Sequence, residues 1–155
     1  RFMAASDIYN FIRVNDAVIT GGLPTTEQLE AVSADGYTAV LNLFPFDPAR
    51  SLPDEAGLVR GLGMAYEHIP VAWGNPTDAD LAAFEQIMLQ RAGDRILIHC
   101  AANYRATAFY SLFARKHRGW LRDEAQAFRA RIWTGSDYPV WRAFIARREA
   151  MITGD

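Results

Sequence analysis

The 155-residue sequence contains one cysteine, Cys100, and three histidines. A single cysteine excludes an internal disulfide framework and any metal site built from several thiolates. A lone thiol is typical of a reducing compartment, where it stays available for chemistry, so we expect a cytoplasmic protein. His68 and His117 lack the spaced acidic or cysteine partners of a metal site, so we expect neither a bound metal nor another cofactor.

Long apolar segments, an excess of charge and low-complexity tracts are also missing. No apolar run approaches the roughly 18 residues needed to cross a membrane, so no membrane partner is expected. The formal net charge is −2, whereas a nucleic-acid-binding domain is usually basic, so no nucleic-acid partner is expected either. Without repeats or flexible linkers, the chain is predicted to form a single domain over residues 1–155.

What the sequence does contain is an alternation of strand and helix patterns. Short apolar segments bounded by turn residues predict strands at 17–20, 38–44, 65–71 and 95–99. Amphipathic segments that begin with capping residues predict helices at 25–34, 53–62, from 76 onward, 106–117, 121–133 and 138–152. The pattern therefore predicts an α/β fold in which helices flank a central, mostly parallel sheet of four to five strands and the C-terminal third is helical.

The last predicted strand leads into Asp94-Arg-Ile-Leu-Ile-His-Cys-Ala-Ala-Asn-Tyr-Arg-Ala-Thr107. Cys100 follows the strand, and Arg105 comes five positions later, where an apolar helix begins. The N–H groups of such a loop and of the helix N-terminus favour an anion, and an arginine can bind two phosphate oxygens at once. The same field stabilises a thiolate, the nucleophilic form of cysteine. These residues predict cysteine-dependent hydrolysis of phosphate esters.

With these residues in view, the chain resembles the nonclassical, dual-specificity-like protein tyrosine phosphatases of bacteria and the related phosphatase-like domain of beta-lactamase-hydrolase-like proteins. The resemblance rests on Gly21-Gly-Leu-Pro-Thr-Thr-Glu-Gln-Leu29, Gly36-Tyr-Thr-Ala-Val-Leu-Asn-Leu43, Tyr66-Glu-His-Ile-Pro-Val71 and above all His99-Cys-Ala-Ala-Asn-Tyr-Arg-Ala-Thr107. It implies a dual-specificity-phosphatase-like fold and metal-independent hydrolysis of phosphate monoesters. The implied partners are a phosphorylated protein, phosphotyrosine above all, or a small phosphate ester.

The resemblance also assigns roles within the loop. It implies Cys100 as the nucleophile, Arg105 as the phosphate-binding arginine and Thr107 as a hydroxyl that helps the thiolate leave. The remaining loop positions are expected to present their N–H groups to phosphate or sulfate: Ala101, Ala102, Asn103 and Tyr104. His99 is expected to orient the loop through hydrogen bonds.

The loop departs from the commonest phosphatase signature in two respects. Four residues, rather than five, separate Cys100 from Arg105, and none of the four is glycine. Asn103 is the expected substitute for the glycine, because asparagine tolerates a left-handed backbone better than other residues with a side chain.

A general acid is needed to protonate the leaving group. In relatives the acid is an aspartate after the strand that ends here at Val71, but this chain has Ala72-Trp-Gly-Asn75 at that place. We predict Asp78 as the acid, with the role of helix cap as its main alternative. The other candidates are Asp80, Asp47, Asp54 and Glu55.

Two further functions are consistent with the same residues. Rhodanese-like sulfurtransferases resemble this arrangement and have a shorter cysteine loop, so a persulfide on Cys100 is one alternative. An inactive module that binds phosphate is another, because the upstream acid and the loop glycine are both missing.

Overall fold

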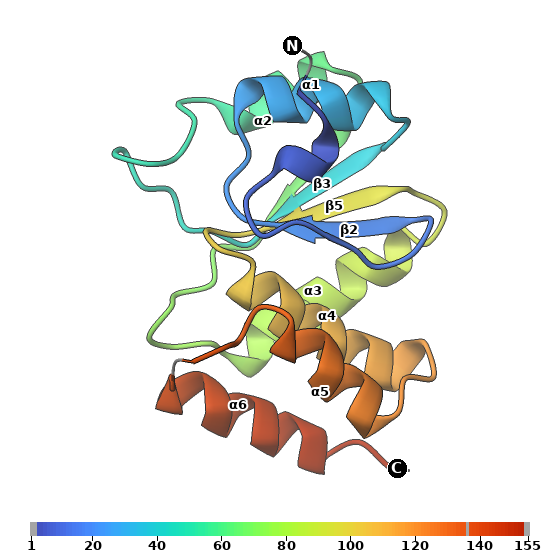
Figure 1. Ribbon diagram of the computed structural model, residues 1–155, viewed down its shortest axis with the longest axis vertical. Helices are drawn as coiled ribbons and strands as arrows, with labels where there is room; N and C mark the ends of the chain where they lie inside the picture. Colours follow the sequence, from blue (N-terminus) through green and yellow to red (C-terminus); the bar gives the residue numbers. More distant parts are fainter. Residues whose placement is uncertain (1–2, 136, 154–155) are drawn as a thin grey trace.

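The computed structural model describes residues 3–135 and 137–153 (Figure 1). Its centre is a five-stranded sheet in the order β1-β2-β5-β3-β4. The strands are β1 (Ile12–Arg13), β2 (Val18–Gly21), β3 (Ala39–Asn42), β4 (Ala65–His68) and β5 (Ile96–His99). All neighbouring pairs are parallel except β1 with β2. The predicted mostly parallel sheet is therefore confirmed, and β1 is an addition to the predicted strands.

The helices also follow the sequence pattern. They are α1 (Thr26–Ala34), α2 (Glu55–Gly61), α3 (Asp78–Gln90), α4 (Tyr104–His117), α5 (Arg122–Ala130) and α6 (Pro139–Ala150), with a short 3-10 turn at Ala5–Asp7. Thr25 and Thr77 begin α1 and α3, and each threonine side chain accepts a hydrogen bond from a backbone N–H of the first turn. Such caps satisfy N–H groups that have no partner inside the helix.

Two layers of helices cover the two faces of the sheet: α1 and α2 lie on one side, and α3 to α6 on the other (Figure 1). The central strand β5 is buried on both faces. Leu97 belongs to the core beneath α1 and α2, whereas Ile96 and Ile98 belong to the larger core beneath the other helices. This double burial explains why its sequence shows no alternation of polar and apolar residues.

The carboxyl ends of the parallel strands all meet at one edge of the sheet. The connections that leave this edge, at the left of Figure 1, include residues 43–54 after β3, 69–77 after β4 and 100–103 after β5. Ligands of such sheets bind beyond the carboxyl ends of the strands. The topology therefore brings Cys100 together with segments far away in the sequence.

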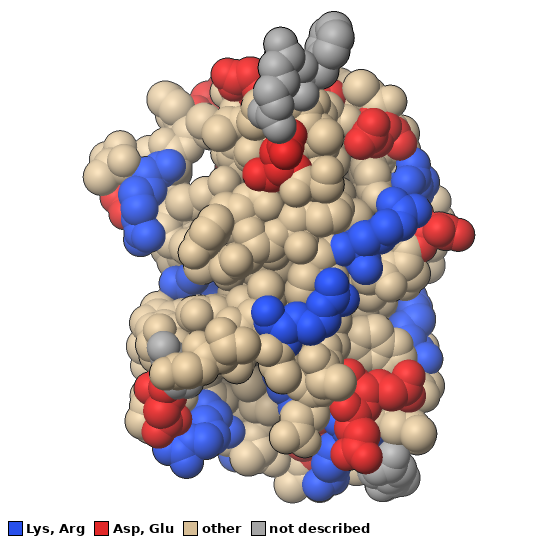
Figure 2. Space-filling view, viewed as in Figure 1, with Lys and Arg blue, Asp and Glu red and all other residues tan. Residues whose placement is uncertain are grey.

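The described helices include none that is long and apolar enough to span a membrane. On the face drawn in Figure 2, basic and acidic side chains are interspersed among uncharged ones. This mixture agrees with the nearly balanced charge of the sequence.

Candidate functional site

Cys100 lies directly beyond β5 and is fully buried. Its N–H donates to the carbonyl oxygen of Gly21 at 3.2 Å, and the N–H of Leu23 donates to the carbonyl of Ala101 at 2.9 Å. A side chain at Gly22 would collide with that Ala101 carbonyl. Gly22, directly after β2, thus allows the cysteine loop to pack against a second backbone segment.

Asn103 has the left-handed conformation that the missing glycine led us to expect, with φ 71°. Its amide nitrogen donates to the carbonyl of Asn10 at 2.8 Å and to the Thr20 hydroxyl at 2.9 Å. Asn10 donates in return to the carbonyl of Ala102 at 3.0 Å. These bonds fix the turn between Cys100 and Arg105, and the involvement of Asn10 is not predictable from sequence spacing.

Arg105 is at the start of α4 and is only 7% exposed. Its Nε donates to the carbonyl of Val71 at 2.8 Å, and its guanidinium lies over the rings of Phe44 and Trp73. Burial lowers the pKa of Arg105, while the charge and hydrogen bonding of the Cys100 side chain act in the opposite direction. The structure therefore brings together the two residues that the motif singled out.

A pocket of about 300 Å³ opens beside this pair. Its lining comprises loop residues, two arginines and four aromatic residues: Phe44, Arg50, Trp73, Ala101, Ala102, Tyr104, Arg105 and Tyr138. The Trp73 ring stacks on Tyr104 at 5.9 Å and meets Tyr138 edge-on at 4.9 Å. The first N–H groups of α4, next to this pocket, have no acceptors within the helix. The pocket can therefore accept an anion beside an aromatic wall.

His99 and Glu55 form a buried pair beneath the loop. Their Nε2 and Oε2 atoms are 2.7 Å apart, and the other ring nitrogen of His99 is 3.2 Å from the carbonyl oxygen of Cys100. Both side chains are nearly inaccessible to solvent. His99 thus contacts the loop backbone, and Glu55, a general-acid candidate, is held by His99. The orienting role of His99 stays a prediction.

Thr107 is buried in the first turns of α4. Its hydroxyl donates to the carbonyls of Asn103 and Tyr104 and accepts from the indole N–H of Trp133 at 3.1 Å. Its hydrogen bonds with described residues do not include one to Cys100. These bonds stabilise the start of the helix, and the role of Thr107 in thiolate departure stays a prediction.

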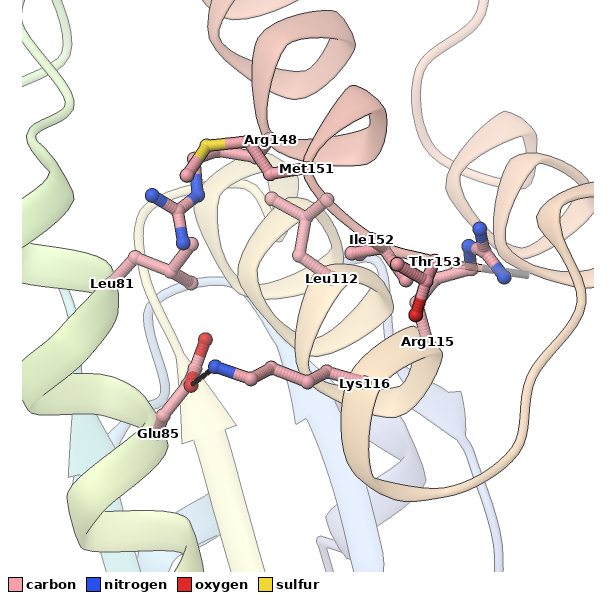
Figure 3. Close-up of a pocket in the computed structure, with 9 residues that line it drawn as sticks. All are labelled: Leu81, Glu85, Leu112, Arg115, Lys116, Arg148, Met151, Ile152 and Thr153. Atoms are coloured by element: carbon pink, nitrogen blue, oxygen red, sulfur yellow. Dashed lines mark hydrogen bonds and ion pairs between the residues drawn. The ribbon is translucent and has the colours of Figure 1, made fainter. Parts of the chain in front are cut away.

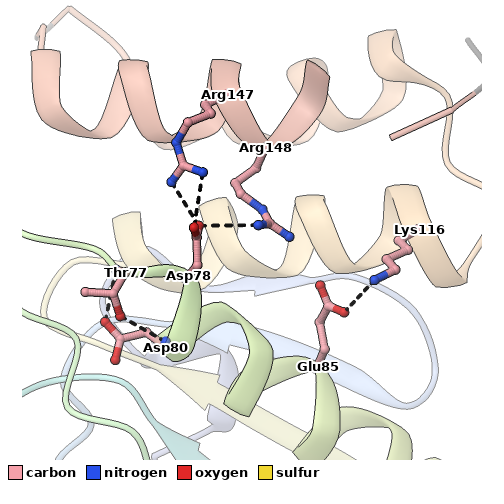
Figure 4. Close-up of polar contacts among 7 residues, drawn as sticks. All are labelled: Thr77, Asp78, Asp80, Glu85, Lys116, Arg147 and Arg148. Atoms are coloured by element: carbon pink, nitrogen blue, oxygen red, sulfur yellow. Dashed lines mark hydrogen bonds and ion pairs between the residues drawn. The ribbon is translucent and has the colours of Figure 1, made fainter. Parts of the chain in front are cut away.

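Asp78 is at the first position of α3, where the structure shows it in ion pairs (Figure 4). Its carboxylate accepts from Arg147 at 2.8 Å and from Arg148 at 3.3 Å, both on α6. The hydrogen bond from Arg147 is the main reason that the pKa of Asp78 lies below its ordinary value. A proton donor needs the opposite shift, so this environment gives the predicted acid role no support.

The other aspartate candidates also have contacts of their own. Asp80 completes the cap of α3 by accepting from the N–H of Thr77 (Figure 4), and Asp54 caps α2. Asp47 accepts from the N–H of Ala49 and from Arg50, and these bonds lower its pKa. The identity of the acid stays a prediction.

We expect Asp78→Asn to lower the melting temperature at neutral pH, because it removes the ion pairs between α3 and α6. A carboxylate whose folded pKa is lowered stabilises the fold above its unfolded pKa, and the effect disappears as pH falls through the folded value. The difference between variant and parent should therefore shrink towards pH 3 and in high salt. Thermal melts over pH and salt series measure it.

Asp16→Asn is the matched control. The Asp16 side chain is fully exposed in its ion pair with Arg13, so this substitution should change the melting temperature little. If Asp78→Asn leaves the melting curves unchanged but abolishes turnover of phenyl phosphate, the ion-pair interpretation is wrong and Asp78 is the proton donor.

A second pocket, of about 260 Å³, lies between α3, α4 and the end of α6 (Figure 3). Its wall includes Leu81, Leu112 and the ion pair between Glu85 and Lys116 at 3.3 Å. Neither Cys100 nor Arg105 lines it. This pocket is therefore separate from the loop between Cys100 and Arg105.

Comparison with models of known protein families finds no match. Among solved structures, the chain is similar to the "Putative phosphatase (DUF442)" of Shewanella putrefaciens CN-32, with 32% identity and a TM-score of 0.86 over 97% of this chain and 98% of that chain. Tk-PTP in its active form matches with 19% identity and a TM-score of 0.72, over 89% and 94% of the two chains. The latter likeness shows the fold, which is that of phosphatases of the protein-tyrosine-phosphatase type.

Among curated proteins, the chain is similar to the beta-lactamase hydrolase-like protein of Xylella fastidiosa (strain Temecula1). The two are 29% identical over 119 residues, which are 75% of this chain and 27% of that protein. The chain thus spans about a quarter of the length of the curated relatives that it matches. Both comparisons agree with the resemblance that the cysteine motif indicated.

Proposed function

The chain belongs to the DUF442 family of protein-tyrosine-phosphatase-like proteins, and from this premise we propose that it hydrolyses phosphate monoesters through a cysteinyl-phosphate on Cys100. We also propose that residues 1–155 form one phosphatase-like domain. The observation that carries the proposal is geometric: Cys100 directly follows β5, Arg105 begins α4 with its guanidinium buried, and Arg105 and the intervening Ala101 and Ala102 line one pocket.

The reaction has two steps. The Cys100 thiolate attacks phosphorus, so that a sulfur–phosphorus bond forms, the ester bond breaks and the leaving oxygen takes a proton. Water then attacks phosphorus, which breaks the sulfur–phosphorus bond, restores the thiolate and releases phosphate. Arg105 and the N–H groups of residues 101–105 hold the phosphoryl oxygens in both steps. No metal is needed, because these donors supply the positive charge.

An aryl phosphate is the favoured substrate class. The rings of Phe44, Trp73, Tyr104 and Tyr138 line the pocket and offer apolar surface to a phenyl ring. A phenolate is also a weaker base than an alkoxide, so its departure depends less on a proton donor. Both points favour phosphotyrosine as the substrate. The smaller need for a proton donor also agrees with the ion pairs that Asp78 forms.

The test is turnover of p-nitrophenyl phosphate and of a phosphotyrosine peptide in the presence of a chelator. We expect both to be hydrolysed at rates that the chelator does not change. Loss of turnover on chelation would contradict the metal-independent mechanism. Robust sulfur transfer from thiosulfate to cyanide without phosphate release would support the sulfurtransferase, and phosphopeptide binding without turnover would support the inactive binding module.

A further inference from the structure

The pocket that Arg105 lines contains a second arginine, which the cysteine motif does not supply. Arg50 lies in the connection between β3 and α2 and lines the same pocket as Arg105. The two guanidinium carbons lie 4.8 and 5.5 Å from the centroid of the same Phe44 ring. The distance between the two guanidinium carbons therefore cannot exceed the sum of these two distances. A small molecule with two anionic groups can span that distance.

Arg50 is positioned by its own turn. The N–H groups of Arg50 and Ser51 donate to the carbonyl of Asp47 at 3.0 and 2.7 Å, and the Asp47 side chain accepts from the N–H of Ala49 at 2.9 Å. The Nε of Arg50 donates to the Asp47 carboxylate at 3.0 Å. This turn and the Phe44 ring restrict the Arg50 side chain before any ligand binds. Binding a ligand therefore costs less conformational entropy than it would for an unrestrained arginine.

Only some of the N–H donors of the Arg50 guanidinium have an acceptor among the described residues. Asp47 engages Nε, and the described residues provide no acceptor for the two terminal nitrogens. The side chain is 57% exposed, so a ligand in the pocket can reach it. Arg50 also affects Arg105 directly: burial is the main cause of the lowered pKa of Arg105, and the positive charge of Arg50 adds to it. An anion between the two arginines would relieve this repulsion.

We infer that Arg50 forms a second phosphate subsite, so that the preferred substrate carries another phosphate group close to the one that Cys100 attacks. The inference rests on the proposed function for the reaction at Cys100, but the subsite itself is defined by binding. An arginine presents paired donors that suit two phosphate oxygens. The shared chemistry is a pair of neighbouring phosphates, whether on a small molecule or on a doubly phosphorylated peptide.

Calorimetric titration with methylphosphonate and with ethylene diphosphonate tests the subsite without any turnover. We expect the parent protein to bind the diphosphonate roughly tenfold or more tightly than methylphosphonate, as one extra charge-assisted contact predicts. Arg50→Ala should remove most of this advantage, and Arg50→Lys should restore only part of it. Arg13→Ala is the matched control, because the Arg13 side chain is about as exposed as that of Arg50, also pairs with an aspartate three residues away and lies outside the pocket.

Melting curves of all variants establish that each is folded. The inference is overturned if the diphosphonate binds no more tightly than methylphosphonate, if Arg50→Ala keeps the advantage, or if Arg13→Ala loses as much of it as Arg50→Ala. If the protein hydrolyses phosphate esters but does not prefer the diphosphonate, the proposed function is supported and the subsite is refuted. If it prefers the diphosphonate but hydrolyses nothing, the subsite is supported and the proposed function is refuted. Competition by a peptide with adjacent phosphotyrosines and by inositol 4,5-bisphosphate, whose phosphates are on neighbouring carbons, then identifies the source, since the stronger Arg50-dependent competitor marks the substrate class.

Discussion

Replacement of Cys100 by serine is expected to reduce kcat/KM for p-nitrophenyl phosphate by on the order of 10³-fold or more, about 4 kcal/mol of transition-state stabilisation. A hydroxyl is a much weaker acid than a thiol, so serine is a far weaker nucleophile than cysteine at this position. Because Cys100 is the only cysteine of the chain, no neighbouring thiol can replace it. Initial rates in the presence of a chelator measure the loss.

Two controls separate lost chemistry from lost structure. Cys100 is fully buried, so Cys100→Ala tests whether the serine hydroxyl itself disturbs the loop. Both variants should keep the parent melting temperature to within a few degrees and should still bind inorganic phosphate, because the loop N–H groups and Arg105 are unchanged. Acid quenching of the parent enzyme during turnover should trap phosphate on the cysteine. A serine variant with full turnover would refute the cysteinyl-phosphate mechanism.

The order of strands and helices was predictable because each element has a local signal. The caps at Thr25 and Thr77 and the apolar segments of the parallel strands identify their elements from a few neighbouring residues. Strand β1 was missed because Ile12–Arg13 is only two residues long and pairs at the edge of the sheet with β2. A pair this short has no periodicity to detect.

The central pair of the site was predictable for a similar reason. Cys100 and Arg105 are close in the chain, and a strand, a tight loop and a helix start dictate their proximity. The left-handed conformation of Asn103 followed from the absence of glycine in the loop. Arg50, Phe44 and Tyr138 were not predicted as site residues, because only the strand order β5-β3-β4 and the packing of the C-terminal helices bring them to the pocket.

The identity of the general acid was the least predictable feature of the site. Asp78 is in a suitable place along the chain, but its partners Arg147 and Arg148 are on α6, 69 and 70 positions away. Nothing local to residues 76–80 signals those ion pairs. A carboxylate near a motif therefore becomes an acid candidate only when its long-range partners are known, because these partners determine the direction of its pKa shift.

Replacement of Arg105 is expected to cause the second large loss of turnover. We expect Arg105→Ala to reduce kcat/KM for p-nitrophenyl phosphate by roughly 10²- to 10³-fold, the usual effect of removing a donor that faces developing charge. The loss should exceed the loss of affinity for inorganic phosphate, because charge builds up on the phosphoryl oxygens in the transition state. Arg105→Lys should recover little of the rate, because an ammonium group cannot make the paired contacts of a guanidinium.

Arg105 also supports the structure, so a control must separate the two roles. Its Nε bond to the Val71 carbonyl ties the segment after β4 to α4, and its loss should lower the melting temperature as well. Arg115 is a buried arginine on the same helix that pairs with Glu149 at 2.7 Å. Arg115→Lys should therefore destabilise the fold without weakening phosphate binding. If Arg105→Lys and Arg115→Lys show the same ratio of lost stability to lost phosphate affinity, Arg105 stabilises the fold only, and phosphate is bound elsewhere.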